Sequence, residues 1–141
     1  MAEEWWTAPA ESQDERLIMV SGRKDVQSFR ANPRFKIRIE VSWVYSAAPD
    51  AAMPDDETAK IMEEATDALQ AVLKADPVAV MTGIYTGAGR RDWIFYTLST
   101  HIFQKKLNDA LASLPLLPLQ ITAENDPDWE EYEEMSQTEI D

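Results

Sequence analysis

The sequence predicts an α+β domain with a ferredoxin-like βαββαβ core, an extra N-terminal β-hairpin and a short C-terminal acidic segment. Residues 35–45 alternate between apolar and mostly polar side chains, as in a strand with one covered face. Residues 54–76 and 99–114 carry apolar side chains at helical spacing. Gly87 and Gly89 separate two further strands between these helices, which gives the element order of a split βαβ sandwich.

Local signals set the remaining boundaries. Residues 4–9 and 15–22 are typical of two short strands, which we expect to extend the sheet or to cover part of its other face. Residues 23–33 are expected to form a loop. Pro77 ends the first helix because proline disfavours a helical residue before it. Residues 119–124 alternate again and form the last predicted strand.

Length and composition indicate one domain. The chain has 141 residues, which suits a single α+β domain over residues 1–132, followed by an acidic tail over 133–141 that we expect to be disordered. No apolar run reaches the roughly 18 to 20 residues that span a bilayer, and the acidic start differs from a signal peptide. There is no cysteine, which excludes disulfides and thiolate chemistry. We therefore expect a cytoplasmic protein without a membrane partner.

Charge is unevenly distributed along the chain. The formal net charge is −13, yet residues 16–38 contain seven basic residues and one acid, and residues 107–141 contain ten acids and no Lys or Arg. One interpretation is a solvated acidic tail that favours solubility. The alternative is that the acidic end docks on a basic surface, either its own or a partner's. High overall acidity disfavours a general nucleic-acid binder, since phosphates attract positive charge.

The central segment 82–97 combines a tight turn, paired positive charge and aromatic residues, in the sequence TGIYTGAGRRDWIFYT. A phosphate loop would lead from a strand into a helix, whereas these glycines join two strands. We therefore expect Gly87 and Gly89 to supply the positive φ angles of a bulged hairpin.

Catalytic signals are weak throughout the sequence. His101 is the single histidine, and it lies in the first turn of a predicted helix. No Ser, His and Asp occur in a recognisable order, and zinc-ligand and calcium-loop spacings are absent. We predict no catalytic residue, no metal and no cofactor, and hence a protein that is not an enzyme.

The aromatic residues have two interpretations. The strand at 93–98 is apolar on both faces, so it is either covered on both or offers rings to a ligand, as RNA-recognition domains do. Trp129 and Tyr132 lie three residues apart, on one side of a short helical turn. We expect both rings to pack back on the sheet while their acidic neighbours approach Arg90 or Arg91.

Three segments together resemble an uncharacterised bacterial family, domain of unknown function 695: a tryptophan-rich start (EWWTAPAE), a central GRRDWIFYT and a terminal DPDWEEY. The resemblance spans roughly residues 4–132 and is strongest at 93–97 and 126–132. That family has no assigned activity. A more distant similarity is to the regulator of ribonuclease activity B, a small acidic inhibitor of ribonuclease E with a ferredoxin-like fold. It implies a non-catalytic regulator that binds a protein, although no inhibitory motif transfers residue by residue.

The function predicted from these features is protein–protein interaction, with a regulatory role such as inhibition of a basic nuclease. The partner is an unidentified protein, or a second copy of the chain paired through an edge strand. One alternative is a small anionic ligand or substrate held by Arg90 and Arg91, and a second is single-stranded RNA on the sheet face. The predicted interaction surface consists of Arg90, Arg91, Asp92, Trp93, Tyr96, Asp126, Trp129 and Tyr132.

Overall fold

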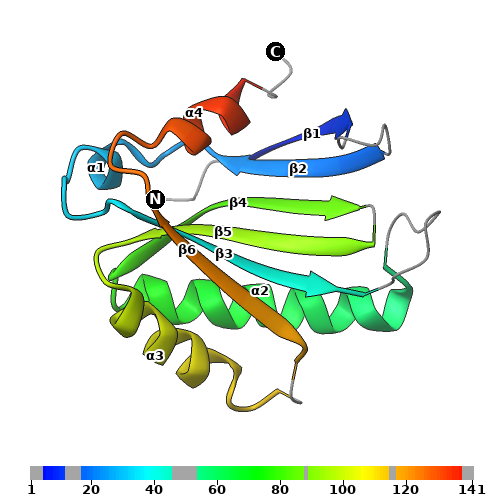
Figure 1. Cartoon of the computed structure of the whole chain (residues 1–141). Helices are drawn as coiled ribbons and strands as arrows, with labels where there is room; N and C mark the ends of the chain where they lie inside the picture. Colours follow the sequence, from blue (N-terminus) through cyan, green and yellow to red (C-terminus); the bar gives the residue numbers. More distant parts are fainter. Residues whose placement is uncertain (1–4, 12–16, 46–53, 88, 115–116, 138–141) are drawn as a thin grey trace.

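All strands of the described chain belong to one antiparallel sheet. The computed structural model describes residues 5–11, 17–45, 54–87, 89–114 and 117–137 (Figure 1). The sheet order is β1-β2-β4-β5-β3-β6. In chain order, the elements are β1 (Trp5–Glu11), β2 (Leu17–Arg23), α1 (Gln27–Arg30), β3 (Ile37–Val44), α2 (Asp56–Ala75), β4 (Ala79–Gly87), β5 (Arg90–Thr97), α3 (Thr100–Leu111), β6 (Leu119–Asn125) and α4 (Glu130–Ser136). The predicted α+β class and all six predicted strands are confirmed.

Strand β3 lies between β5 and β6 and shows why its sequence alternates. Ile39 is paired with Phe95 of β5 and with Ala123 of β6. Ile39 and Val41 have no exposed surface, because they face the helices α2 and α3. The intervening residues Arg38 and Glu40 point to the other face of the sheet, as the two-residue period of a strand requires.

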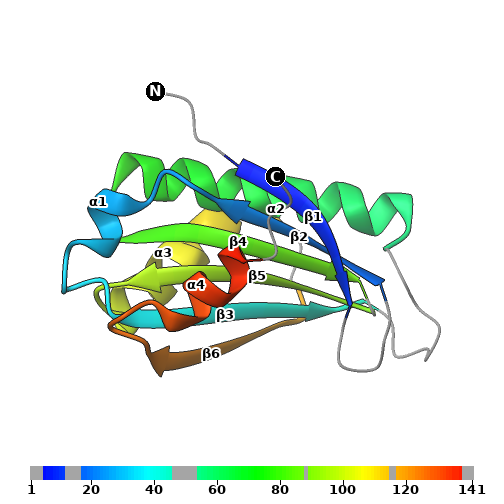
Figure 2. The same ribbon diagram turned by 90° about the horizontal axis from the view of Figure 1, so that it is seen from above.

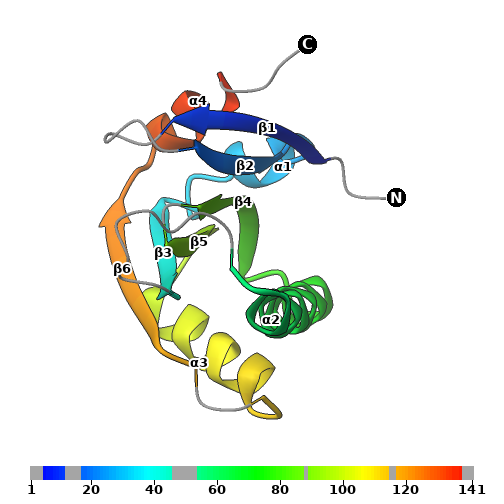
Figure 3. The same cartoon turned by 90° about the vertical axis from the view of Figure 1, so that its right-hand side faces the viewer.

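Helices α2 and α3 cover one face of the sheet (Figures 1 and 3). Asp55 caps α2 by accepting a hydrogen bond from the Thr58 N–H at 2.8 Å, and the chain is extended again at Asp76, before Pro77. Ser99 caps α3 in the same way, with 3.3 Å to the Ile102 N–H. Apolar residues of both helices and of β3, β4 and β5 form the main core.

On the opposite face, the short helix α4 covers part of the sheet, and α1 lies at one end of the sheet, where Phe29 packs on an apolar cluster (Figures 2 and 3). Strand β2 pairs with β4, so the N-terminal hairpin extends the sheet, as expected. Side chains of α4 pack on two apolar clusters of this face, one with Tyr96 and one with Trp6 and Val20.

Two boundaries differ from the prediction. Residues 27–30 form the helix α1 within a segment expected to be a loop, because Val26 and Phe29 pack with Phe35 against the sheet. Residues 133–136, which were expected to belong to a disordered acidic tail, instead continue α4, which ends at Ser136 and buries Met135. Residues 138–141 of that tail lie outside the described residues. The turn between β4 and β5 has the expected positive φ angles, 140° at Gly87 and 84° at Gly89.

Candidate functional site

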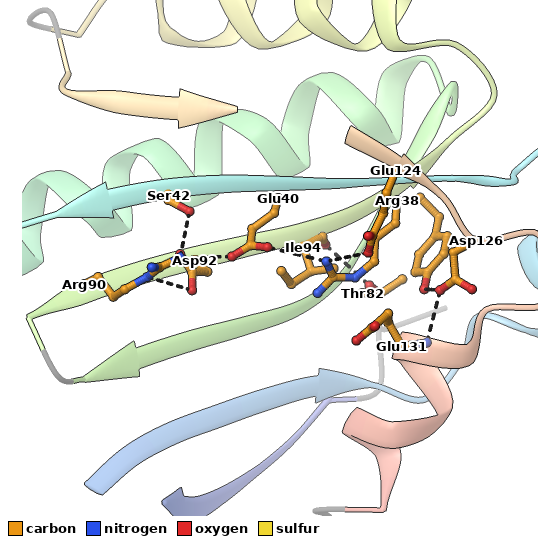
Figure 4. Close-up of polar contacts among 11 residues, drawn as sticks. Arg38, Glu40, Ser42, Thr82, Arg90, Asp92, Ile94, Glu124, Asp126 and Glu131 are labelled. Atoms are coloured by element: carbon orange, nitrogen blue, oxygen red, sulfur yellow. Dashed lines mark hydrogen bonds and ion pairs between the residues drawn. The ribbon is translucent and has the colours of Figure 1, made fainter. Parts of the chain in front are cut away.

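Arg90 is held by acidic and hydroxyl groups on the face opposite α2 and α3 (Figure 4). Its Nε donates to the Asp92 carboxylate at 3.1 Å, and its Nη2 lies 3.0 Å from Glu40 Oε1 and 3.2 Å from Ser42 Oγ. The hydrogen bond to Asp92 is the main cause that raises the pKa of Arg90 above its ordinary value. Arg90 is thus neutralised within the fold, and half of its side chain stays exposed.

Arg91 lies on the other face of the sheet, toward α2. Its Nε donates to Thr86 Oγ1 at 2.9 Å, and its guanidinium carbon is 5.8 Å from the centre of the Trp93 ring. Successive side chains of a strand point in opposite directions, so Arg90 and Arg91 cannot contact the same small anion. The predicted joint anion site is therefore wrong.

The two aromatic residues predicted for the surface of β5 are buried on opposite sides. Trp93 is 1% exposed in the core beneath α2, where its Nε1–H donates to Thr66 Oγ1 at 2.8 Å. Tyr96 has no exposed surface, because Trp129 covers it with 4.1 Å between ring centroids. Neither ring can contact a partner in this fold.

The segment 126–132 connects α4 to the sheet. Trp129 is fully buried, has the left-handed φ of 56°, and donates from Nε1 to the Phe35 carbonyl at 2.7 Å. Tyr132 packs edge-on against Trp129, with ring centroids 5.5 Å apart, and its hydroxyl donates to the Arg23 carbonyl. The expectation that Trp129 and Tyr132 pack back on the sheet is confirmed.

Asp126 is the polar centre of this connection. It accepts hydrogen bonds from the Tyr96 hydroxyl at 2.6 Å and from the N–H groups of Glu130 and Glu131 at 2.9 and 3.1 Å. Burial alone would raise the pKa of Asp126, but these three donors more than offset it, so the pKa lies below its ordinary value. Burial, followed by the bond to Asp126, raises the pKa of Tyr96.

Four residues of the predicted interaction surface are therefore structural in this fold: Trp93, Tyr96, Asp126 and Trp129. Asp92 is also largely covered, at 8% exposure, which leaves Arg90, Arg91 and Tyr132 with appreciable exposed surface.

The acidic end docks on the chain's own arginines, but on different ones from those expected. Glu133 Oε1 lies 2.7 Å from Arg30 Nη1, and Glu124 Oε1 lies 3.3 Å from Arg38 Nη1. The prediction that these acids approach Arg90 or Arg91 is wrong, because Arg90 is occupied by Glu40 and Asp92 and Arg91 faces the helices.

Arg38 was not among the predicted site residues, yet it organises the charged face of the sheet (Figure 4). Its side chain is only 11% exposed, lies between Glu40 and Glu124, and has an Nε atom that is buried without a hydrogen-bond partner. Burial tends to lower the pKa of Arg38, but Glu40 and further acidic groups outweigh it and raise the pKa overall. The alternation in residues 35–45 already placed Arg38 on the polar face of its strand, which is the sequence signal that could have identified it.

An excess of acid remains around α4. Exposed carboxylates lie on α4, in the turn before it and at the end of β6, and we call this set the acidic α4 surface: Glu124, Asp128, Glu130, Glu131, Glu133 and Glu134. Arg30 and Arg38 pair with two of these acids. The acidic α4 surface therefore keeps a strong net negative charge.

Metal ligands do not gather anywhere in the described part of the chain, where no three His, Asp or Glu side chains are grouped closely enough to hold an ion. Likewise, none of the helices in the described ranges is long and apolar enough to cross a membrane. The absence of catalytic activity stays a prediction.

Comparison with known proteins gives a family. The sequence model of a family of unknown function, DUF695, matches residues 4–135. This chain belongs to the DUF695 family. The match includes every strand of the sheet and nearly all of α4, so the Trp129 connection lies within the DUF695 domain. No match to this DUF695 protein was found among curated proteins.

Proposed function

We propose that this DUF695 protein is a non-catalytic interaction domain that binds a basic protein partner through the acidic α4 surface. The observation that carries the proposal is the excess of exposed carboxylates around a helix that is itself firmly anchored by Trp129. Negative charge on a rigid support attracts a basic partner and orients its approach. We further propose that the core is ferredoxin-like, which the strand order β4-β5-β3-β6 and the element order from β3 to β6 support.

A regulatory role is the finer form of this proposal. A row of carboxylates can imitate the phosphates of a nucleic acid before the basic cleft of a nuclease. The fold-level similarity to the regulator of ribonuclease activity B motivates this variant, and residues 126–137 supply the carboxylates. A cytoplasmic location belongs to the same proposal and rests on the cysteine-free sequence.

RNA binding on the sheet face is the weaker candidate. Single-stranded RNA is recognised by bases that stack on exposed rings. Tyr96, the ring of β5 on that face, is already stacked under Trp129. The neighbouring positions Glu40 and Asp92 are carboxylates, which repel phosphates.

Pairing of two copies through β6 is the alternative within the interaction class. β6 is an edge strand of seven residues with no Lys, Pro or Gly, the residues that commonly block edge pairing. Light scattering after size-exclusion chromatography separates the alternatives, because a dimer at micromolar concentration that Thr122→Pro abolishes would favour the β6 edge.

Affinity capture tests the proposed function. The tagged full-length protein is incubated with a lysate of its source cells, treated with nuclease, and washed at low and high salt. We expect a basic protein that is retained after nuclease treatment and released by salt, since exposed charge pairs are screened. Capture of RNA alone, or of a protein that salt does not release, would contradict the proposal.

Charge-neutralising variants test whether the captured partner binds to the acidic α4 surface. The triple variant Asp128→Asn, Glu130→Gln and Glu134→Gln removes three charges from the acidic α4 surface, and none of these three side chains forms an ion pair with another described residue. The matched control changes Glu64→Gln, Asp67→Asn and Asp109→Asn on the exposed faces of α2 and α3. Only the first set is expected to lose the captured partner.

A further inference from the structure

A pocket lies between the N-terminal half of α2 and the strands β2 and β4, on the face away from the acidic α4 surface. Its volume is about 360 Å³, and its lining includes Met19, Ser21, Glu63, Ile84, Thr86 and Arg91. Among the described residues, no side chain of β2 belongs to the apolar core beneath α2 and α3. The strands β2 and β4 therefore leave a hollow beside the N-terminal half of α2.

Arg91 contributes a positive charge to this pocket with unused donors. Its Nε donates a hydrogen bond to Thr86 Oγ1. The guanidinium group also lies over the Trp93 ring, and these two contacts orient its plane. Within the described part of the chain, its two terminal nitrogens make no hydrogen bond and no ion pair. These nitrogens form the end-on fork that matches the two oxygens of a carboxylate.

The charge of Arg91 is also less fully compensated than that of Arg90. Burial lowers the pKa of Arg91 below its ordinary value, and the nearby Glu63 offsets this only in part. Arg90, in contrast, touches two carboxylates directly. A partly buried arginine whose donors are not all used gains stability from an added anion.

The rest of the lining limits the kind of anion. Met19 and Ile84 provide partly buried apolar surface next to the hydroxyl of Ser21. Glu63 is an exposed carboxylate among the lining residues. Its repulsion grows with the charge of the ligand, so it disfavours a ligand with two or more negative charges more than a ligand with one. The volume is near the lower end of ligand pockets, which span roughly 300–1,000 Å³.

We infer that this pocket binds a small organic monocarboxylate, with its carboxylate on the terminal nitrogens of Arg91 and its short apolar portion against Met19 and Ile84. This site is separate from the acidic α4 surface and does not rest on the proposed protein interaction. A variant that no longer binds a carboxylate in this pocket should still bind a partner through the acidic α4 surface, and the reverse should also hold.

Calorimetric titration with butyrate and with butyramide tests the inference on the wild-type protein. The two molecules have nearly the same shape, but butyramide lacks the charge. We expect butyrate to bind at least about tenfold more tightly, as a charge-assisted hydrogen bond implies. Equal affinity for the two molecules, or no saturable binding of butyrate, would overturn the inference.

Two arginine variants locate the site. Arg91→Gln is expected to lose about tenfold or more in butyrate affinity, whereas Arg90→Gln, which removes the same charge from the opposite face, should change it less than about twofold. Circular dichroism verifies that each variant is folded. Equal weakening by both variants would show that only the net charge matters, and unchanged binding by Arg91→Gln would exclude this pocket.

Discussion

Trp129 lies flat on Tyr96, with ring centroids 4.1 Å apart and ring planes inclined by 16°. The same indole donates a hydrogen bond to the Phe35 carbonyl. One side chain thus connects α4 to β5 and to the chain just before β3. The helix α4, which carries the acidic α4 surface, is too short to be stable alone, so its folding depends on this contact.

Replacing Trp129 by alanine should destabilise the protein by about 3–5 kcal/mol, the range for a buried large aromatic residue. The cost combines the lost stacking and the unpaired Phe35 carbonyl. Urea unfolding followed by circular dichroism measures it. Val44→Ala is the control, since Val44 is 52% exposed and should change stability by less than about 0.5 kcal/mol. Loss of less than about 1 kcal/mol in Trp129→Ala would mean that the stacking is not structural.

Truncation after Glu124 should expose Tyr96 and Val80, whose cover includes Trp129 and Tyr132. We expect the melting temperature to fall by several degrees and binding of a hydrophobic dye to rise. A truncation after Gln137 keeps all of α4 and is the matched control, for which we expect little change. A shortened protein with the melting temperature of the full chain would contradict the role of α4.

The pKa of Asp126 predicts an acid-dependent contribution to stability. Its pKa is lower in the folded state than the ordinary value, so the folded state resists protonation of this carboxyl. Its contribution is therefore present above the unfolded pKa of about 3.9 and is lost as the pH falls through the folded value. Asp126→Asn should be less stable at pH 7 by about 1 kcal/mol, and this difference should shrink below about pH 4. If the difference in stability between Asp126→Asn and the wild type stays constant from pH 7 to pH 3, the ionised Asp126 carboxylate does not contribute to stability.

Tyr85 of β4 predicts that the stability of the protein falls as the pH rises in the alkaline range. Burial raises its pKa to about 12, whereas an unfolded tyrosine ionises near about 10. Between these values the unfolded state loses its proton and the folded state keeps it, so stability should fall as the pH rises. Tyr85→Phe should make this decline shallower, as urea midpoints at several pH values would show. Identical slopes for the variant and the wild type would exclude the effect.

Local sequence patterns were enough to predict most elements of the fold. The alternation around Ile39 and Val41 identified β3, and Pro77 fixed the end of α2, because both signals act within a few residues. The helix α1 has no such signal. It forms because Val26 and Phe29 pack on a cluster that includes Val80 and Trp129, and those contacts join distant parts of the chain.

The candidate site was harder to predict, for two different reasons. The opposite orientation of Arg90 and Arg91 follows from the period of the predicted strand, and a joint anion site was inconsistent with that period. The packing of Trp129 on the sheet was expected from the sequence, but the sequence did not show that Tyr96 is the ring that Trp129 covers. Arg38 became central only because its strand neighbours and Glu124 surround it.

The acidic α4 surface is tested most directly by the affinity of the captured partner for the two triple variants, measured by calorimetry at physiological salt. Asp128→Asn, Glu130→Gln, Glu134→Gln should weaken binding by about tenfold or more, and the control set on α2 and α3 by less than about twofold. Equal affinities of the wild type and the acidic α4 variant would contradict the proposed function.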